Sequence, residues 1–434
     1  MPMSLSSDFQ TFCSSLVLDT SAMTVTCGEI AKKLNLHYYN LPGETKEHCY
    51  IVGSVGRKTA KSKTSDLDVI FDLPQDVFKK YDNYEGNGQS QLLQEVKNVL
   101  KERYPKTTMR GDGQVIVIEF TSYTVELVPG FKQSDDRFKY PDTHDGGSWK
   151  YTDPLSEQEE TETADDSSEK NFRRFCRMLR QWKNQCGVVM GGLLIDSLCY
   201  NHFVSKSYYV GKSYSDYYEM LVELFEYLKS LNKDQSYWYA LGSNQLVYNT
   251  DNGSFISKAS DAYQKLMDAN DDEGKYSALN AIFGKTFPEY QAKSAYSLYA
   301  GTTYTDTEQF IEDMFPVEIR YSLRIDCNVR QNGFRDFLLR KALRERHILR
   351  HNKSLTFQIE YCDVPAPYNI YWKVRNVGAV AESRNMIRGE IKKTDSRTQG
   401  ERTSFQGPHF VECYIVKNNV CVARDRIDVP IGSI

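Results

Sequence analysis

The segment at residues 53–69, GSVGRKTAKSKTSDLDV, constrains the fold more than any other part of the chain. The Gly-Ser pair at Gly53 and Ser54 is followed, after a short basic loop, by Asp66 and Asp68 within an apolar run. Side chains two residues apart on a strand point to the same face, about 7 Å apart along the strand. The spacing therefore predicts two converging carboxylates, an arrangement that can hold Mg²⁺ and leave positions open for phosphates.

A third carboxylate is expected on a neighbouring strand, because two-metal phosphoryl chemistry usually employs one. Residues 113–131, GQVIVIEFTSYTVELVPGF, have the pattern of two strands joined by a Thr-Ser-Tyr turn. Glu126 lies within the second strand, where an acid is costly unless it is paired or bound to metal. Glu119 is a rival, but no second motif surrounds it, and we expect it on the solvated face. Asp66, Asp68 and Glu126 are therefore the candidate catalytic and metal-binding residues.

The Gly-Ser pair predicts a phosphate cradle. Gly53 allows the backbone to approach a phosphate closely, and the Ser54 hydroxyl with neighbouring N–H groups would hold it. Arg57 and Thr59 would extend this cradle. Glu126 would complete the site of a second metal ion that lowers the pKa of an attacking ribose hydroxyl. Alone, a Gly-Ser pair is usually a turn and D-x-D a solvated strand edge; their spacing, with V-E-L-V-P downstream, favours the functional interpretation.

Composition is that of an ordinary globular protein, with 434 residues, 40% hydrophobic and 26% charged. No apolar stretch is long enough to cross a bilayer and the N-terminus lacks a signal-peptide pattern, so we expect a cytoplasmic protein with no membrane partner. Ten cysteines without C-x-x-C pairs predict reduced thiols. The net charge of −4 argues against nucleic-acid coating and leaves room for a local basic groove.

Changes in residue composition and pattern along the chain predict four parts. Residues 1–165 would form the strand-rich catalytic core with N-terminal helices, and residues 166–290 a helical nucleotide-binding lobe. Residues 291–306 are small and polar, which is typical of a linker. Residues 307–434 contain short β-patterned runs separated by turn residues, which favours a β-sandwich. We interpret 132–170 as loop, ending in an acidic run that starts a helix.

The helical segment that begins at Asn171 carries a basic stripe at Arg177, Arg180 and Lys183. Arg180 or Lys183 would reach a triphosphate across the cleft. A merely solvated basic helix face explains the stripe equally well.

Three further residues are candidates for nucleotide contact. Ser236 and Tyr237 would hold a nucleotide, with the tyrosine ring stacked on a base; a buried core tyrosine is an equal alternative in a chain with 30 tyrosines. Lys258 is a weaker candidate for phosphate contact.

The motifs G-S-x-x-x-x-T…S-D-L-D-V, V-E-L-V-P, R-M-L-R-Q-W-K and F-G-K-T-F-P together resemble the cGAS/DncV-like nucleotidyltransferases (CD-NTases, SMODS-type) of the polymerase β superfamily. The similarity covers about residues 25–290. It implies that Asp66, Asp68 and Glu126 are metal ligands and that Gly53 and Ser54 contact the triphosphate. It also implies that Arg180 or Lys183 is the cation that contacts phosphate. Many members have Asp where Glu126 stands, so the resemblance implies Mg²⁺ with a possible shift towards Mn²⁺.

The C-terminal part resembles the adenylyl/guanylyl and SMODS (AGS-C) sensor domain through P-Y-N-I-Y-W-K-V-R-N-V-G and G-P-H-F-V-E-C-Y-I-V-K. The resemblance implies a possible activating ligand on this domain. Trp372, Lys373, Arg388 and His409 could line its pocket, although Trp372 is better explained as sandwich core and His409 as a structural histidine. The basic stretch at 332–353 is interpreted as a solvated helix face, with binding of an acidic ligand as the alternative.

The expected fold is α/β (α+β): a bilobed, polymerase-β-like nucleotidyltransferase with a mixed sheet and a helical lobe, plus a C-terminal β-sandwich. The resemblance implies that ATP and other ribonucleoside triphosphates are joined into a cyclic oligonucleotide that binds a downstream effector in antiphage defence. Three alternatives remain open: linear oligoadenylate synthesis, nucleotidyl transfer to a protein or small molecule, and an inactive binding module.

Overall fold

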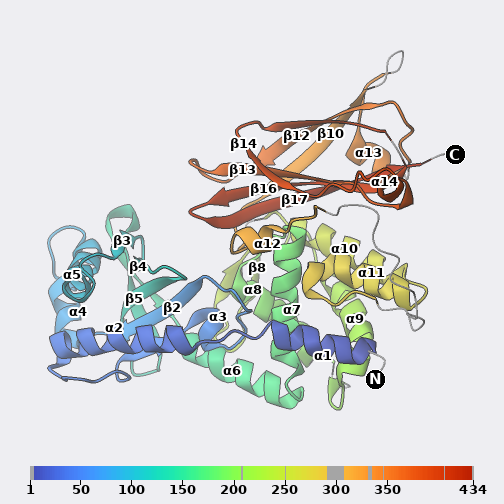
Figure 1. Cartoon of the computed structure of the whole chain (residues 1–434). Helices are drawn as coiled ribbons and strands as arrows, with labels where there is room; N and C mark the ends of the chain where they lie inside the picture. The colour runs from blue at the N-terminus through green and yellow to red at the C-terminus, as the bar shows by residue number, and fades with distance from the viewer. Residues whose placement is uncertain are drawn as a thin grey trace. The chain divides into compact units, whose positions relative to one another are not determined.

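The computed structural model describes residues 4–206, 209–249, 251–290, 307–330, 335–345, 347–404 and 406–432. The chain forms two compact units (Figure 1). Residues 4–181 and 191–256 form what we call the N-terminal unit, and residues 182–190 with the chain from Ser257 onward form the C-terminal unit. These units divide the chain elsewhere than at the expected boundaries of 165, 290 and 306, which stay predictions. The expected linker at 291–306 lies outside the described residues.

A seven-stranded mixed sheet organises the N-terminal unit, in the order β1-β2-β5-β4-β3 with β6 and β7 continuing from β5. β2 pairs in parallel with β5, and the other pairs are antiparallel. The strands are β1 (Cys49–Ile51), β2 (Asp66–Asp72), β3 (Thr108–Asp112), β4 (Val115–Glu119), β5 (Thr124–Lys132), β6 (Phe138–Asp142) and β7 (Ser148–Thr152). The two strands predicted within 113–131 are thus β4 and β5.

The main core of this unit lies on one face of the sheet, under helices α2 (Ser21–Tyr39) and α5 (Gly88–Arg103) (Figure 1). Leu67 and Val69 of β2 point into it and are fully buried. Because strand residues alternate, Asp66 and Asp68 lie on the opposite face. That face carries a smaller apolar cluster around Ile70.

The remaining elements of this unit are mostly helical. They are α1 (Leu5–Ser15), α3 (Gly53–Gly56), α4 (Gln75–Asp82), α6 (Pro154–Ser167), α7 (Asn171–Cys186), α8 (Gly192–Val204), α9 (Tyr217–Ser230), and the hairpin β8 (Tyr237–Tyr239) and β9 (Leu246–Tyr248). The end of α7, from Trp182 onward, belongs to the C-terminal unit. The prediction of a loop at 132–170 was wrong, because β6, β7 and α6 occupy most of this range. The acidic run is itself the helix α6, which Asp153 caps by accepting the Ser156 N–H.

The C-terminal unit contains two four-stranded antiparallel sheets, β11-β10-β12-β15 and β14-β13-β16-β17, which form the predicted β-sandwich (Figure 1). The strands are β10 (Leu323–Arg330), β11 (Phe337–Leu338), β12 (Ser354–Cys362), β13 (Asn369–Arg375), β14 (Ile391–Thr394), β15 (Thr398–Arg402), β16 (Gly407–Lys417) and β17 (Val420–Ile431). The helices are α10 (Ser254–Met267), α11 (Asp272–Phe283), α12 (Ile311–Met314), α13 (Leu339–Arg344) and α14 (Ala379–Ser383). Trp372 is 2% exposed in the sandwich core, as expected.

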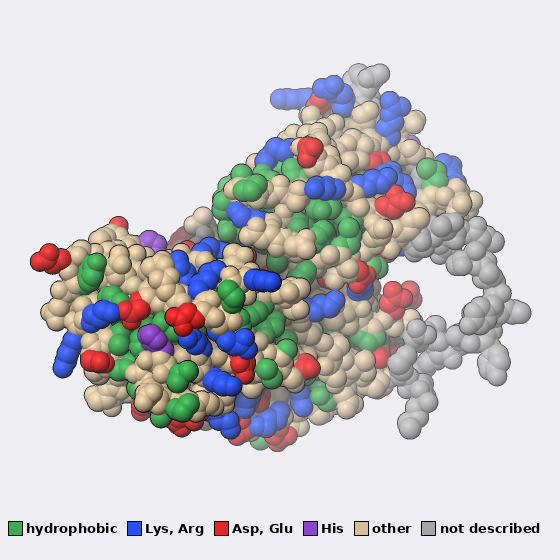
Figure 2. Space-filling view, turned by 60° about the vertical axis from the view of Figure 1, so that its left-hand side comes forward, with side chains coloured by type: hydrophobic (Ala, Val, Ile, Leu, Met, Phe, Trp, Pro, Cys, Tyr) green, Lys and Arg blue, Asp and Glu red, His purple; other side chains and the backbone are tan. Residues whose placement is uncertain are grey.

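Surface chemistry agrees with the composition. Lys and Arg side chains are interspersed with Asp and Glu over the face seen in Figure 2. All ten cysteines lie in the described residues and none of them is in a disulfide. Among the described residues, no helix is both long and apolar enough to span a bilayer.

Candidate functional site

The parallel pairing of β2 and β5 puts the three candidate carboxylates on one face of the sheet. Asp68 is the register partner of Glu126, and Asp66 is the partner of Thr124. Partners on parallel strands point to the same side, with the strands about 4.8 Å apart. All three carboxylates are half-buried. The sheet therefore places three oxygen donors on the face that lies away from the main core.

Gly53 lies directly against the carboxylate of Asp68. Its φ is +60°, and a Cβ atom built on it would be 1.8 Å from Asp68 Oδ2. The backbone at this point is also joined to β2, since the Val52 N–H donates to the Asp68 carbonyl over 2.9 Å. Only glycine can combine this φ with so close an approach. The Gly-Ser loop is therefore held in contact with the predicted metal ligands.

Ser54 lies in the single helical turn α3 and is half-buried. Its carbonyl accepts the N–H groups of Thr59 and Ala60 over 2.9 and 3.0 Å. Within the described ranges its hydroxyl has no protein partner, so it can donate to a phosphate oxygen.

The donor set suits a hard divalent cation, because carboxylate oxygens are the ligands that Mg²⁺ and Mn²⁺ prefer. The close approach at Gly53 adds a concave backbone surface beside Asp68. As the side chains are placed, no three His, Cys, Asp or Glu residues of the described chain are arranged to bind a metal ion. The fit thus rests on the strand register and on ligand chemistry.

Asp196 on α8 is the centre of a buried polar network that sequence reasoning missed. This carboxylate is 0% exposed, and it accepts hydrogen bonds from Thr59 Oγ1 at 2.7 Å and Arg57 Nε at 3.0 Å. Arg180 of α7 adds two more bonds, at 2.5 and 2.9 Å. Burial opposes ionisation, but the two guanidinium groups and the hydrogen bonds lower the pKa of Asp196 to about 2.

This network gives Arg57, Thr59 and Arg180 protein partners, and their expected phosphate contacts stay predictions. Their side chains are buried and bonded to Asp196, and Arg57 also donates to Glu157 over 2.8 Å. A buried guanidinium requires its carboxylate partners, because an unpaired charge in the interior is strongly unfavourable. The described contacts of the three residues hold the Gly53–Ser54 loop against α7 and α8. An acid inside the apolar run GLLIDSLCY was the available signal, the same signal that identified Glu126.

Lys183 and Lys258 both belong to the C-terminal unit and are paired there. Lys183 is 3.2 Å from Glu318, with its side chain 8% exposed. Lys258 is 3.5 Å from Asp425. Their expected phosphate contacts stay predictions, and the described contacts give both lysines a role in ion pairs.

Tyr237 belongs to a cluster of exposed aromatic residues on the hairpin β8–β9. Its side chain is 40% exposed, so the alternative of a buried core tyrosine is excluded. The rings of Tyr239 and Tyr248 lie 6.0 and 6.1 Å from it. Ser236 contributes its carbonyl, which accepts the Asn249 N–H. The hairpin is joined to β7 of the main sheet by Gln245, whose Nε2 donates to the Tyr151 carbonyl over 3.1 Å.

Comparison with protein families gives two matches. Residues 3–165 match the Second Messenger Oligonucleotide or Dinucleotide Synthetase (SMODS) domain. This matched range contains the Gly-Ser pair and all three carboxylates. Residues 305–432 match the Adenylyl/Guanylyl and SMODS C-terminal sensor domain, which includes the β-sandwich.

Individual relatives are distant. A "Probable cyclic nucleotide synthase" of Bacillus cereus (strain VD146) is 23% identical over 259 residues, which are 54% of this chain and 75% of the relative. The structure of E. coli MS115-1 CdnC with ATP is 17% identical, with a TM-score of 0.49 over 65% of this chain and 98% of that one. The Vibrio cholerae di-nucleotide cyclase DncV is 12% identical, with a TM-score of 0.46 over 66% and 86%.

Proposed function

Because the chain belongs to the cGAS/DncV-like nucleotidyltransferases (CD-NTases), with a synthetase domain followed by a sensor domain, we propose that it joins ribonucleoside triphosphates into a cyclic oligonucleotide in a Mg²⁺-dependent reaction. The observation that carries the proposal is the pairing of Asp68 with Glu126 across β2 and β5, beside Asp66 and against Gly53.

Each part of this site has a role in nucleotidyl transfer. Asp66, Asp68 and Glu126 would hold the divalent cations, which when bound supply charge neutralisation of the triphosphate and a lower pKa of the attacking hydroxyl. The Ser54 hydroxyl and the N–H groups of α3 would orient the terminal phosphates for departure as pyrophosphate. Glu126, the third residue of β5, would accept the proton of the ribose hydroxyl. Mn²⁺ would be accepted in place of Mg²⁺, since both cations bind carboxylate oxygens.

The tyrosine cluster on β8–β9 supports the proposal that both substrates, the donor and the acceptor of the nucleotidyl group, are nucleotides. Every base has a π-face, so exposed aromatic rings can stack on any of the bases. Tyr237, Tyr239 and Tyr248 would hold a base in this way. ATP is the first substrate to test, followed by the other ribonucleoside triphosphates.

The biological setting is proposed as well. A cyclic product would act on a downstream effector in antiphage defence, and its triphosphate substrates place the reaction in the cytoplasm. Linear oligoadenylate synthesis is the second candidate, because it employs the same three carboxylates and differs in where the acceptor nucleotide lies.

The test is incubation of the purified chain with each labelled ribonucleoside triphosphate, alone and in pairs, with Mg²⁺ or Mn²⁺. Asp68→Asn is the control, since it keeps the shape of the side chain and removes its charge. A phosphatase-resistant product made by the native chain and absent from the control supports cyclic synthesis, and mass spectrometry identifies it. A product that phosphatase shortens favours linear oligomers. A labelled protein or small-molecule adduct would contradict the proposal.

A further inference from the structure

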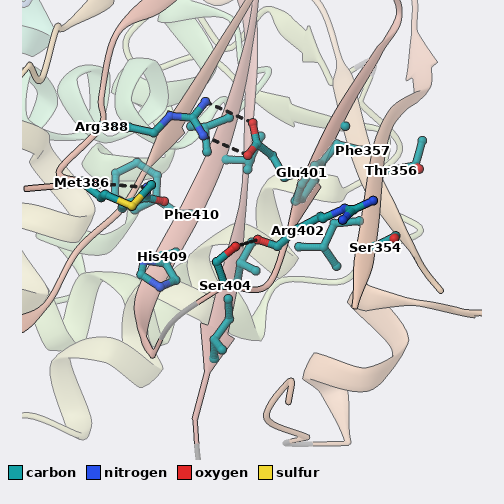
Figure 3. Close-up of a pocket in the computed structure, with 17 residues that line it drawn as sticks. Ser354, Thr356, Phe357, Met386, Arg388, Glu401, Arg402, Ser404, His409 and Phe410 are labelled. Atoms are coloured by element: carbon teal, nitrogen blue, oxygen red, sulfur yellow. Dashed lines mark hydrogen bonds and ion pairs between the residues drawn. The ribbon is translucent and has the colours of Figure 1, made fainter. Parts of the chain in front are cut away.

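A pocket of about 540 Å³ opens between the two sheets of the C-terminal sandwich (Figure 3). Its inner wall is apolar and comes from both sheets. The residues are Leu355 and Phe357 of β12, Val374 of β13, Val411 of β16, and Val429 and Ile431 of β17. All six belong to the same hydrophobic core or pack against it. The sandwich interior is therefore incompletely filled at this end.

An ion pair connects the two sides of the pocket. Arg388, which precedes β14, donates from both terminal nitrogens to the carboxylate of Glu401 on β15, over 2.9 and 3.1 Å. Figure 3 shows the two side chains facing each other above the apolar wall. Arg388 is 42% exposed and Glu401 is 18% exposed, so the pair stands where the pocket meets solvent.

The pair still has hydrogen-bonding capacity. Arg388 has five N–H donors. In the described part of the chain two of them bind Glu401, and the other three have no protein acceptor. Each oxygen of Glu401 has a further lone pair, one of which accepts Gln399 Nε2 over 2.9 Å. A ligand at this edge would therefore meet donors and an acceptor side by side.

The charges around the pocket disfavour a polyanion. Arg388 and Glu401 neutralise each other. Arg402 also borders the pocket, but it pairs in register with Ser354 on the exposed face of β12, so its side chain points away from the inner wall. A triphosphate or a cyclic oligonucleotide would bring two or more negative charges against Glu401 without a matching set of cations.

We propose that this pocket binds a small uncharged heteroaromatic molecule, whose flat apolar body lies against the inner wall and whose polar edge bonds to Arg388 and Glu401. The volume suits a single small ligand. A flat ring fills the narrow space between two sheets, and a heterocycle supplies the acceptor for Arg388 and the donor for Glu401. This proposal goes beyond the synthase reaction, because it concerns a second site on the other domain.

The experiment is a binding titration of the full chain with adenine as the probe, in the absence of metal and triphosphates. Val374→Phe fills the pocket from β13. Val420→Phe is the matched control, since Val420 also packs at the margin of the sandwich core but does not line the pocket. Thermal unfolding of both variants is measured to show that they fold. We expect adenine to bind the native chain and Val420→Phe, and to bind Val374→Phe at least tenfold more weakly.

The polar edge is tested separately with Glu401→Gln and Arg388→Gln, each expected to weaken adenine binding about tenfold. Glu390→Gln removes an exposed carboxylate outside the pocket and should leave binding unchanged. Adenine binding that Val374→Phe does not alter, or no binding by folded native chain, overturns the proposal. Displacement of adenine from the pocket by metal-free ATP overturns its uncharged character. None of these readouts depends on synthase activity, so the two proposals fail independently.

Discussion

Arg180 on α7 and Asp196 on α8 form a two-point ion pair, with Nη1–Oδ1 and Nη2–Oδ2 distances of 2.5 and 2.9 Å. The same carboxylate holds Arg57 and Thr59, which follow the Gly53–Ser54 turn. Thr59 returns to that turn through its N–H, which donates to the Ser54 carbonyl. The buried carboxylate of Asp196 thus connects α7, α8 and the predicted phosphate loop.

Replacing Asp196 with Asn should destabilise the chain. The substitution keeps the shape but removes the counter-charge of the buried Arg180 and leaves Arg57 paired with Glu157 alone. Breaking a buried ion pair typically costs about 3–5 kcal/mol. The measurement is the free energy of unfolding in urea. Asp135→Asn breaks the exposed pair with Arg137 and is the matched control, expected to be neutral. Equal stability of the Asp196 variant and the native chain would contradict the role of the network.

Acid pH should weaken the N-terminal unit through His202. This residue of α8 is 1% exposed, and in the described structure its Nδ1 has no hydrogen-bond partner. Burial, aided by nearby Lys206, lowers its pKa from 6.5 to about 4. The unfolded chain therefore binds one more proton between these values, so stability is complete above pH 6.5 and falls towards pH 4.

The slope from this one group approaches about 1.4 kcal/mol per pH unit within that window. It is measured by urea unfolding at a series of pH values. His202→Gln should flatten the slope, while the exposed His37→Gln should not. An unchanged slope in the His202 variant would rule out this source.

Gly53→Ala should abolish synthesis while leaving the fold intact. The new methyl group would collide with the Asp68 carboxylate and displace it, and an error of about 1 Å in such a group can cost roughly 100-fold in rate. Gly43→Ala is a sharp control, because Gly43 also has a positive φ, +81°, but open space where its Cβ would lie. If both variants lose activity equally, backbone strain rather than displacement of Asp68 is the cause.

Glu126→Gln should lower the rate by roughly 100-fold or more, since it removes a metal ligand and the acceptor of the hydroxyl proton. Binding of Mn²⁺, followed by electron paramagnetic resonance, should weaken in the same variant. Glu119→Gln is the control on the adjacent strand, where the carboxylate is 43% exposed and paired with Arg110. Chelation of divalent cations should silence the native chain; activity that persists would refute the metal site.

Tyr237→Ala should raise the KM for nucleotide roughly tenfold, because stacking of a base on an aromatic ring is worth about 1–3 kcal/mol. Tyr237→Phe keeps the ring and should retain most of the affinity. Tyr361→Ala removes another exposed tyrosine, on β12 of the other unit, and serves as the control. A normal KM in the alanine variant would exclude this ring from the nucleotide site.

The metal-ligand candidates were accessible to sequence reasoning because each rests on a local rule. Asp66 and Asp68 share a face by the two-residue period of a strand, and the structure has both on β2. Glu126 is identified as an acid within an apolar strand, and the structure has it on β5 between the buried Val125 and Leu127. What the residues could not specify was the register that pairs Asp68 with Glu126, because strand pairing is a contact between distant segments.

The cations show the limit of such rules. Helical spacing placed Arg180 on a stripe, but it could not reveal that Asp196 lies opposite on another helix. The same uncertainty applied to Arg57 and Thr59, whose position near the Gly-Ser pair suggested phosphate contact. Tyr237 was the reverse case, since its exposure, which the sequence left open, favours the functional interpretation.

By itself the sequence determined the paired strands that carry the acidic metal-ligand candidates, the C-terminal β-sandwich, and the family. These follow from periodicity and motif spacing, which act over a few residues. Only the tertiary structure decided which buried charges pair with one another. It alone also revealed the pocket in the sandwich and the Arg388–Glu401 ion pair at its edge. The reason is physical: burial removes water from a charge, so its partner is chosen by whatever the fold packs beside it.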